Sequence, residues 1–423
     1  IWFLKRINLF KLIHRTIKVN EKLKILFVDD EITLLQSLRR ATRSMRKEWD
    51  CEFVSSGKEA LRILSDKPFD LVVSDMRMPE MNGAQFLRKV KKQNPNTMRF
   101  ILSGQTEDKA FFQSIGAMHQ FLSKPCDFNF LKGTINRGLS LRRSLHNDKI
   151  KKLLLKIDSL PSMPELYCEL MEELQSDNST LENVGNIISK DIGMTIKILQ
   201  VANSAFFGSP NSVSTPVHAV QVLGLELIQS LVLSCQIFSK LNLSNKNELQ
   251  TGKIWKHSIN VAELAMALAK VEKVKCDIEN YSFTAGLLHE IGKMIVLVNL
   301  PEMYQEYLLK LEADNRNELE IEKEVFGSSC AQVGAYLIGL WGLPDPIVEA
   351  IIYHETPSKC ISKSPSALTF VHVANVLVQG SVEGYIQEIP DKLDQKYLEE
   401  IGMLDRFSKW KKILMEFDLE NGG

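Results

Sequence analysis

The chain has 423 residues, of which 44% are hydrophobic and 25% are charged, a composition typical of a globular protein with two or three domains. Its 52 basic residues balance its 52 acidic ones, so the net charge of +0 provides no overall attraction to nucleic acid or to an anionic membrane. The 7 cysteines include no CxxC pair, which argues against a zinc ribbon or a disulfide framework and favours a reducing, cytoplasmic compartment.

The first 22 residues form a basic N-terminal extension, in which lysines and arginines alternate with apolar residues such as Trp2, Phe3 and Leu4. The apolar run is too short and too charged to span a bilayer, so no transmembrane segment is expected. Two interpretations remain open. The extension is either a basic amphipathic helix on a membrane surface or, as we favour, a disordered segment ahead of the folded chain.

From residue 23 to about residue 140, short apolar runs alternate with segments of helical periodicity. The runs are ILFVDDE, LVVSDMRMPEMNG, RFILSG and FLSKP, and Leu34, Leu38, Ala41 and Met45 recur at helical spacing after the first. Alternation of this kind predicts an α/β domain with a flavodoxin-like, doubly wound parallel sheet.

Polar side chains follow the predicted strands. Asp29 and Asp30 end the first run, Asp75 ends the second, and Ser103 and Lys124 follow the third and fourth. In an open parallel sheet, ligands bind at the carboxyl ends of the strands, so these side chains are expected to share one pocket. Clustered carboxylates repel one another unless a hard cation lies among them, and the pocket therefore suits Mg²⁺ and a phosphoryl group.

This stretch resembles the receiver domain of two-component response regulators, matched at the residues just named and at an aromatic, Phe121, three residues before Lys124. The resemblance implies that a sensor histidine kinase phosphorylates Asp75. It also implies that Ser103 and Lys124 contact the phosphoryl group and that Ser103 and Phe121 act as the switch. The implied Mg²⁺ ligands are Asp30, Asp75 and the backbone carbonyl of Arg77, with Asp29 acting through water. For Ser103 alone, a turn serine before Gly104 is an equally good explanation.

Residues 128–157 contain no proline and keep a roughly helical period, which predicts that the last receiver helix continues into a helical connector. Beyond it the strand signal disappears. Residues 158–356 are expected to form an all-α domain, and residues 357–423 a C-terminal helical extension without a chemical motif.

The helical segment resembles the HDOD domain, a relative of the HD phosphohydrolases. The matching text includes SLPSMPELYCELMEEL, IISKDIGMTIKILQVANSAFFG, FTAGLLHEIGKMIV and VGAYLIGLWGLPDPIVEAIIYHE. The resemblance implies a signalling output that acts through an unidentified protein partner; a homodimer is left open.

In HD enzymes, histidines and a His-Asp pair hold divalent metals that activate water. The corresponding residues here are His257, His289, Glu290 and His354. Glu290 replaces an aspartate, and Cys330, Glu355 and Asn375 stand where better ligands are expected. Either this is a vestigial site that binds one divalent metal, or its residues are bonded locally within helices, and we favour the second.

Three functions compete. The first is a phosphorylation switch whose output domain is not an enzyme, apart from loss of the receiver's own phosphate. The second is a phospho-regulated, metal-dependent phosphohydrolase that cleaves a cyclic dinucleotide. The third, a DNA-binding regulator, is disfavoured because no helix-turn-helix pattern or basic stripe stands out after residue 160.

Overall fold

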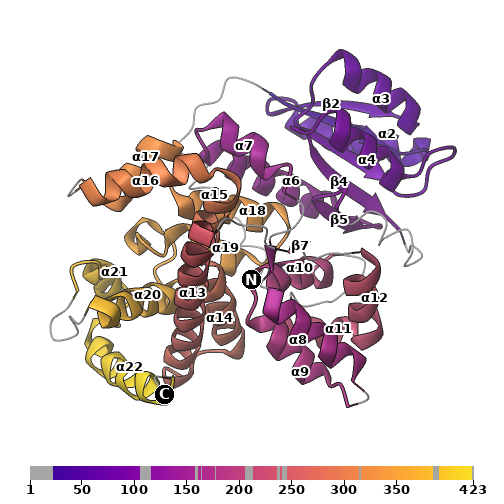
Figure 1. The fold of residues 1–423 in the computed structure, drawn as a ribbon. Coiled ribbons are helices and arrows are strands. Elements are labelled where there is room, and N and C mark those ends of the chain that lie inside the picture. The colour runs from indigo at the N-terminus through magenta and orange to yellow at the C-terminus, as the bar shows by residue number, and fades with distance from the viewer. Residues whose placement is uncertain are drawn as a thin grey trace.

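The computed structural model describes residues 22–104, 116–157, 161–162, 164–176, 178–204, 213–235, 239–240, 245–313, 316–383 and 390–421. The predicted N-terminal extension, apart from residue 22, lies outside these residues, and so does the side chain of Ser103. Figure 1 shows an open sheet with flanking helices at the start of the chain and a larger helical part after it.

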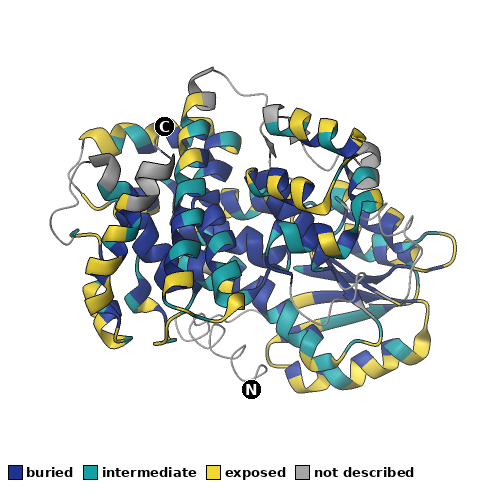
Figure 2. Cartoon of the chain, turned by 90° about the horizontal axis from the view of Figure 1, so that it is seen from below, coloured by how far each residue is buried: buried dark blue, intermediate teal, exposed yellow. Residues whose placement is uncertain are grey.

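The N-terminal part is a five-stranded parallel sheet with the strand order β2-β1-β3-β4-β5, as expected for a doubly wound fold. The central strand β3 is buried along its whole length and β1 over its last four residues, whereas β2 at the edge is mostly half-buried, as the dark blue and teal ribbons of the sheet in Figure 2 show. The elements are β1 (Leu23–Val28), α2 (Ile32–Ala41), β2 (Trp49–Val54), α3 (Gly57–Asp66), β3 (Leu71–Asp75), α4 (Gly83–Gln93), β4 (Met98–Ser103), β5 (Gln120–Ser123) and α6 (Phe128–Ser144).

The connector is helical, but it is two helices and not one. Helix α6 ends at Ser144, Leu145 is extended at φ −83° and ψ 132°, and α7 (Asp148–Leu154) begins after a bend. Asn147 starts the second helix, because its side-chain oxygen accepts from the backbone N–H groups of Lys149 at 2.9 Å and Ile150 at 3.4 Å. The predicted connector is therefore helical, but the last receiver helix does not continue through it, because Asn147 starts a new helix.

The rest of the chain is almost entirely helical, as predicted. Its elements are β6 (Pro161–Ser162), α8 (Pro164–Gln175), α9 (Leu181–Ser189), α10 (Ile192–Ala202), α11 (Pro216–Leu223), α12 (Leu225–Cys235), β7 (Ser239–Lys240), α13 (Asn245–Val271), α14 (Cys276–Leu288), α15 (Ile291–Asn299), α16 (Pro301–Ala313), α17 (Glu318–Phe326), α18 (Cys330–Leu340), α19 (Asp345–Tyr353), α20 (Ala367–Glu383), α21 (Gln395–Glu400) and α22 (Phe407–Asn421).

Helix α20 differs from the expected role of residues 357–423. It packs against α13, α14 and α19 and buries Leu368, Phe370, Val371 and Ala374, so it is part of the helical core and not an appended extension. The physical reason is its apolar sequence, ALTFVHVANVLVQG, which must be removed from water. Among the described residues no single helix is long and apolar enough to cross a bilayer, although the bent combination of Cys276–Asn299 with Pro301–Ala313 reaches that length and hydropathy.

Candidate functional sites

The first site lies at the carboxyl end of the sheet, where Lys124 joins two aspartates. The Lys124 Nζ lies 2.6 Å from Asp29 Oδ2 and 2.5 Å from Asp75 Oδ1. Asp29 directly follows β1, Asp75 ends β3 and Lys124 directly follows β5, so three parallel strands deliver the three groups to one edge. The structure therefore brings Asp29, Asp75 and Lys124 together, as the sequence predicts.

Backbone donors fix the remaining carboxylate oxygens. The N–H of Glu31 donates to Asp29 Oδ1 at 2.9 Å, and the N–H of Arg77 donates to Asp75 Oδ2 at 2.7 Å. Both aspartates are buried, whereas Asp30 is exposed beside them. The carboxylates therefore cannot swing freely, and one oxygen of each stays directed at the ammonium of Lys124.

Burial and charge act against each other in this pocket. Burial raises the pKa of Asp75, and the nearby charge of Asp29 adds to the rise, while Lys124 and the Arg77 N–H oppose it. For Lys124, burial lowers the pKa, but hydrogen bonds to Asp29 and Asp75 outweigh it and raise the pKa overall. The pocket thus holds two acidic groups that need a cation, with only one ammonium supplied by the protein.

The other predicted receiver residues are placed as follows. Ser103 ends β4 and pairs in register with Ser123, next to Lys124, so its backbone lies at the same edge of the sheet. Phe121 in β5 is already buried, with 5% of its surface exposed. Asp30 follows Asp29 directly and is exposed; carboxylate oxygens are ligands that Mg²⁺ prefers, but the three aspartates are not gathered around one point as the ligands of a bound ion would be.

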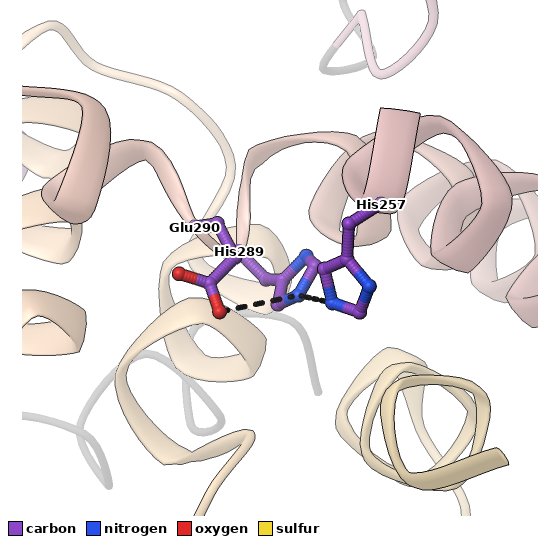
Figure 3. A group of neighbouring side chains, drawn as sticks. All are labelled: His257, His289 and Glu290. Carbon is purple, nitrogen blue, oxygen red and sulfur yellow. Dashed lines mark hydrogen bonds and ion pairs between the residues drawn. The ribbon is translucent and has the colours of Figure 1, made fainter. Parts of the chain in front are cut away.

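The second site is a histidine cluster in the helical part. His257 comes from α13, and His289 and Glu290 occupy the junction between α14 and α15 (Figure 3). Each of the three offers a ligand atom within 4.8 Å of the others, and no other group of three His, Cys, Asp or Glu residues in the described ranges does so. His354 packs its ring edge-on to His289, with centroids 5.0 Å apart, but is not a member of that group.

Backbone carbonyls set the tautomers of two histidines. His289 Nδ1 lies 2.6 Å from the carbonyl of Gly286, and His354 Nδ1 lies 2.8 Å from that of Ile351. Carbonyls only accept, so both Nδ1 atoms carry a proton, and the Nε2 of the neutral His289 keeps its lone pair. A backbone bond of this kind is also what orients metal-ligating histidines.

The spacing of the ligand atoms suits a bound metal, but some of the hydrogen bonds that these atoms already make compete with metal binding. The Nε2 atoms of His257 and His289 are 3.3 Å apart, the separation of about 3.3 Å expected for two nitrogens bound tetrahedrally at 2.0–2.1 Å. However, His257 Nε2 is also 2.9 Å from Asn375 Oδ1, an acceptor, so His257 must change tautomer before it can bind a cation. Burial lowers the pKa of both His257 and His289, which keeps them neutral.

Glu290 is already paired with a lysine. Lys293 Nζ lies 3.0 Å from Glu290 Oε1 and 2.8 Å from Glu318 Oε1, and Tyr307 donates its hydroxyl to Glu318 at 2.6 Å. Burial alone would raise the pKa of Glu290, but Lys293 chiefly lowers it to about 2. Lys293 and Glu318 belong to this site, and sequence reasoning missed them as a network because they lie on separate helices, α15 and α17.

Cys330 and Asn375, which stand where better metal ligands are expected, are also buried and hydrogen-bonded. Cys330 begins α18, and its backbone N–H donates to Glu322 Oε2 at 2.9 Å. Burial raises the pKa of the Cys330 thiol well above its usual value, so no thiolate is available as a ligand. Asn375 also accepts from the Gln379 side chain at 3.1 Å. Both departures from an enzyme-like ligand set therefore have structural partners.

Two family models match the chain, one for each domain. The family model of the response regulator receiver domain matches residues 25–136, and that of the HDOD domain matches residues 160–357. The chain is a response regulator with a receiver domain and an HDOD domain. This confirms both predicted resemblances and the fold class.

Curated relatives match part of this response regulator. The transcriptional regulatory protein ZraR of Escherichia coli (strain K12) is 31% identical over 131 residues, covering 30% of this chain and 28% of ZraR. An uncharacterized protein of Treponema pallidum (strain Nichols) is 24% identical over 225 residues, covering 53% of this chain and 43% of that protein. The chain thus spans less than half the length of these relatives.

Two solved structures each cover more than half of the chain. The MmoQ response regulator of Methylococcus capsulatus str. Bath is 21% identical, covers 60% of this chain and 98% of its own, and has a TM-score of 0.47. An HDOD domain protein of Geobacter sulfurreducens is also 21% identical, covers 67% and 94%, and has a TM-score of 0.37.

Proposed function

We propose that a histidine kinase phosphorylates Asp75 of this response regulator and that the HDOD domain passes the phosphorylated state on through protein contacts. The observation that carries the proposal is the pocket of Asp75, whose buried carboxylate shares the Lys124 ammonium with Asp29. A buried carboxylate at the end of a parallel strand, with a neighbouring cation, is placed for nucleophilic attack on phosphorus.

The residues have distinct proposed roles. Asp75 forms the new O–P bond as the donor's bond to phosphorus breaks, and Lys124 leaves the carboxylate to neutralise the added phosphoryl oxygens. Ser103 donates to one of those oxygens. Asp30, Asp75 and the Arg77 carbonyl would hold Mg²⁺, with Asp29 acting through water, and the cation supplies charge neutralisation for the incoming phosphoryl group.

Labelling with a small phosphodonor tests this proposal. Acyl-phosphate formation should require Mg²⁺ and should be lost in Asp75→Asn, which keeps the size of the side chain but removes the nucleophile. Asp70→Asn is a matched control, because Asp70 lies at the other end of β3 and its carboxylate accepts from Lys24 N–H at 3.0 Å. Labelling that persists in Asp75→Asn contradicts the assignment.

For the HDOD domain we propose little or no phosphodiesterase activity. The lysine that pairs with Glu290 is itself held between two carboxylates, and Asn375 occupies the hydrogen-bonding atom of His257. A second metal would need further ligands, and Cys330 does not supply one because its buried thiol stays protonated. The expected result is no loss of cyclic dinucleotide from protein prepared with Mn²⁺ or Fe²⁺.

A second candidate function is the binding of one divalent metal by His257, His289 and Glu290. The short separation of the two Nε2 atoms and the carbonyl-fixed tautomer of His289 favour it. The metal content of purified protein should then fall in His289→Ala but not in His218→Ala, a histidine of α11 outside the cluster. Turnover of a cyclic dinucleotide that disappears in His289→Ala would instead establish an enzyme.

A further inference from the structure

Helix α18 lies between the receiver domain and the histidine cluster. Of its 11 residues, Cys330–Leu340, all but Gln332 are buried. Gly334 and Gly339 are five positions apart, which places them about 140° apart around the helix axis. One side of α18 therefore faces the receiver and a different side faces the cluster, and Figure 1 shows α18 between α6 and α15.

The receiver side is in close contact with α18. A Cβ atom at Gly339 would lie 2.3 Å from Leu141 Cδ1 of α6, so the two helices meet without spare room. The Gln120 side chain donates to the Gly339 carbonyl at 3.3 Å, and Gln120 is the first residue of β5, the strand that leads to Lys124. A movement of β5 would therefore act directly on α18.

The other side of α18 supports the junction that carries His289 and Glu290. A Cβ atom at Gly292 would lie 1.8 Å from the carbonyl oxygen of Cys330, and one at Gly334 would lie 2.6 Å from Ile291 Cγ2. Gly292 is two residues after Glu290. Close-packed interiors transmit displacement because they hold few voids, so a shift of α18 must displace α15.

Helix α19 makes a second connection. Arg137 of α6 pairs with Asp345 at 3.0 Å and also donates to the Leu343 carbonyl, which holds the first turn of α19 against the receiver. His354 follows the last residue of the same helix and packs on the ring of His289. Nine residues at 1.5 Å each make α19 a rigid segment of about 13 Å between the two contacts.

We propose that α18 and α19 couple the state of Asp75 to the histidine cluster, so that a phosphoryl group in the receiver changes the packing of His289, Glu290 and His354. This rests on the proposed phosphorylation of Asp75. The local cause is Lys124, which must leave two carboxylates to reach the phosphoryl oxygens and draws the end of β5 with it. Linkage is reciprocal, so a cation bound at the cluster would in turn alter the phosphorylation equilibrium of the receiver.

Hydrogen exchange on the full chain, with and without beryllofluoride and Mg²⁺, tests the coupling. Exchange over residues 286–299 and 330–354 should change at least about fivefold, the lower range of allosteric coupling. A response confined to the strand ends around Asp29, Asp75 and Lys124 overturns the proposal. If beryllofluoride leaves the hydrogen exchange of even those strand ends unchanged, the result contradicts the proposed phosphorylation. The coupling is then tested with a variant that needs no phosphate.

That variant is Gly339→Ala, in which the added methyl group would meet Leu141 Cδ1, so that the side chain of Leu141 or α18 itself must move. Exchange over residues 286–299 should rise at least about fivefold relative to Gly380→Ala, whose methyl group would meet nothing within 4 Å. Equal exchange in the two variants overturns the coupling. If Gly339→Ala fails to fold, Arg137→Met decides in its place: it removes the contact to α19 without adding volume to the interface, and unchanged exchange around His354 then refutes the proposal.

Discussion

Replacing Lys124 with methionine should destabilise the receiver domain by about 3 kcal/mol. The ammonium lies within 2.6 Å of two carboxylates whose side chains are only 5% and 8% exposed. Removing one partner of a buried ion pair costs about 3–5 kcal/mol, and we take the lower end because the lysine side chain is 22% exposed and partly screened by water. The loss arises because Asp29 and Asp75 are left buried with no protein cation between them.

Two further measurements separate this cause from loss of packing. In the Asp75→Asn background the same substitution should cost only about 1 kcal/mol, because one buried charge has already gone. Millimolar Mg²⁺ should restore part of the stability of Lys124→Met, since a divalent cation can replace the ammonium. The assay is native-state hydrogen exchange of the amides in β1 and β3, which exchange only when the sheet opens.

A surface lysine provides the control. Lys67→Met removes an ion pair with Glu52 at side chains that are 45% and 32% exposed, and should cost less than about 1 kcal/mol. The electrostatic reasoning is refuted if Lys124→Met costs equally much with and without the Asp75 carboxylate, or if its cost matches that of Lys67→Met.

Two other predictions follow from the geometry. Gly83→Ala should unfold or severely loosen the receiver, because its Cβ would lie 2.2 Å from the Asp75 carbonyl oxygen, whereas Gly57→Ala, with its nearest contacts at 3.6 Å, should be tolerated in the same thermal melt. Burial lowers the pKa of His372 to about 4, and its unprotonated Nε2 accepts from the Asp394 N–H at 2.9 Å. A depressed histidine pKa contributes stability that is present above about pH 6.5 and is lost as the pH falls toward 4, here about 3 kcal/mol. In denaturant titrations, the free energy of unfolding should therefore differ less between pH 7 and pH 4 in His372→Gln than in the parent chain.

Local patterns carried most of the receiver prediction. Each strand is a short apolar run followed at once by its functional residue, so the order of Asp29, Asp75, Ser103 and Lys124 along the chain indicates where they meet once a parallel sheet is assumed. The histidine cluster was also predicted as a set of residues, because a family resemblance marked His257, His289 and Glu290. In both cases short local motifs were enough to mark each candidate residue.

Tertiary structure alone decided how those residues are bonded. Lys124 and Asp29 are 95 positions apart, and nothing local indicates that the ammonium would be shared with Asp75. The pairing of Lys293 with both Glu290 and Glu318 likewise depends on how α15 and α17 pack.

The organisation between the domains was also beyond the sequence. Helical periodicity continues through Leu145, yet Asn147 caps a new helix there, because a side-chain bond to two backbone N–H groups outweighs an apolar pattern. The contact between Arg137 and the start of α19 joins positions more than 200 residues apart. The amino-acid sequence by itself indicated the fold class, most of the elements and the candidate residues of both sites apart from Lys293 and Glu318. Only the tertiary structure shows that α6 packs against α18 and contacts the start of α19, because such contacts arise when surfaces from separate parts of the chain are buried together.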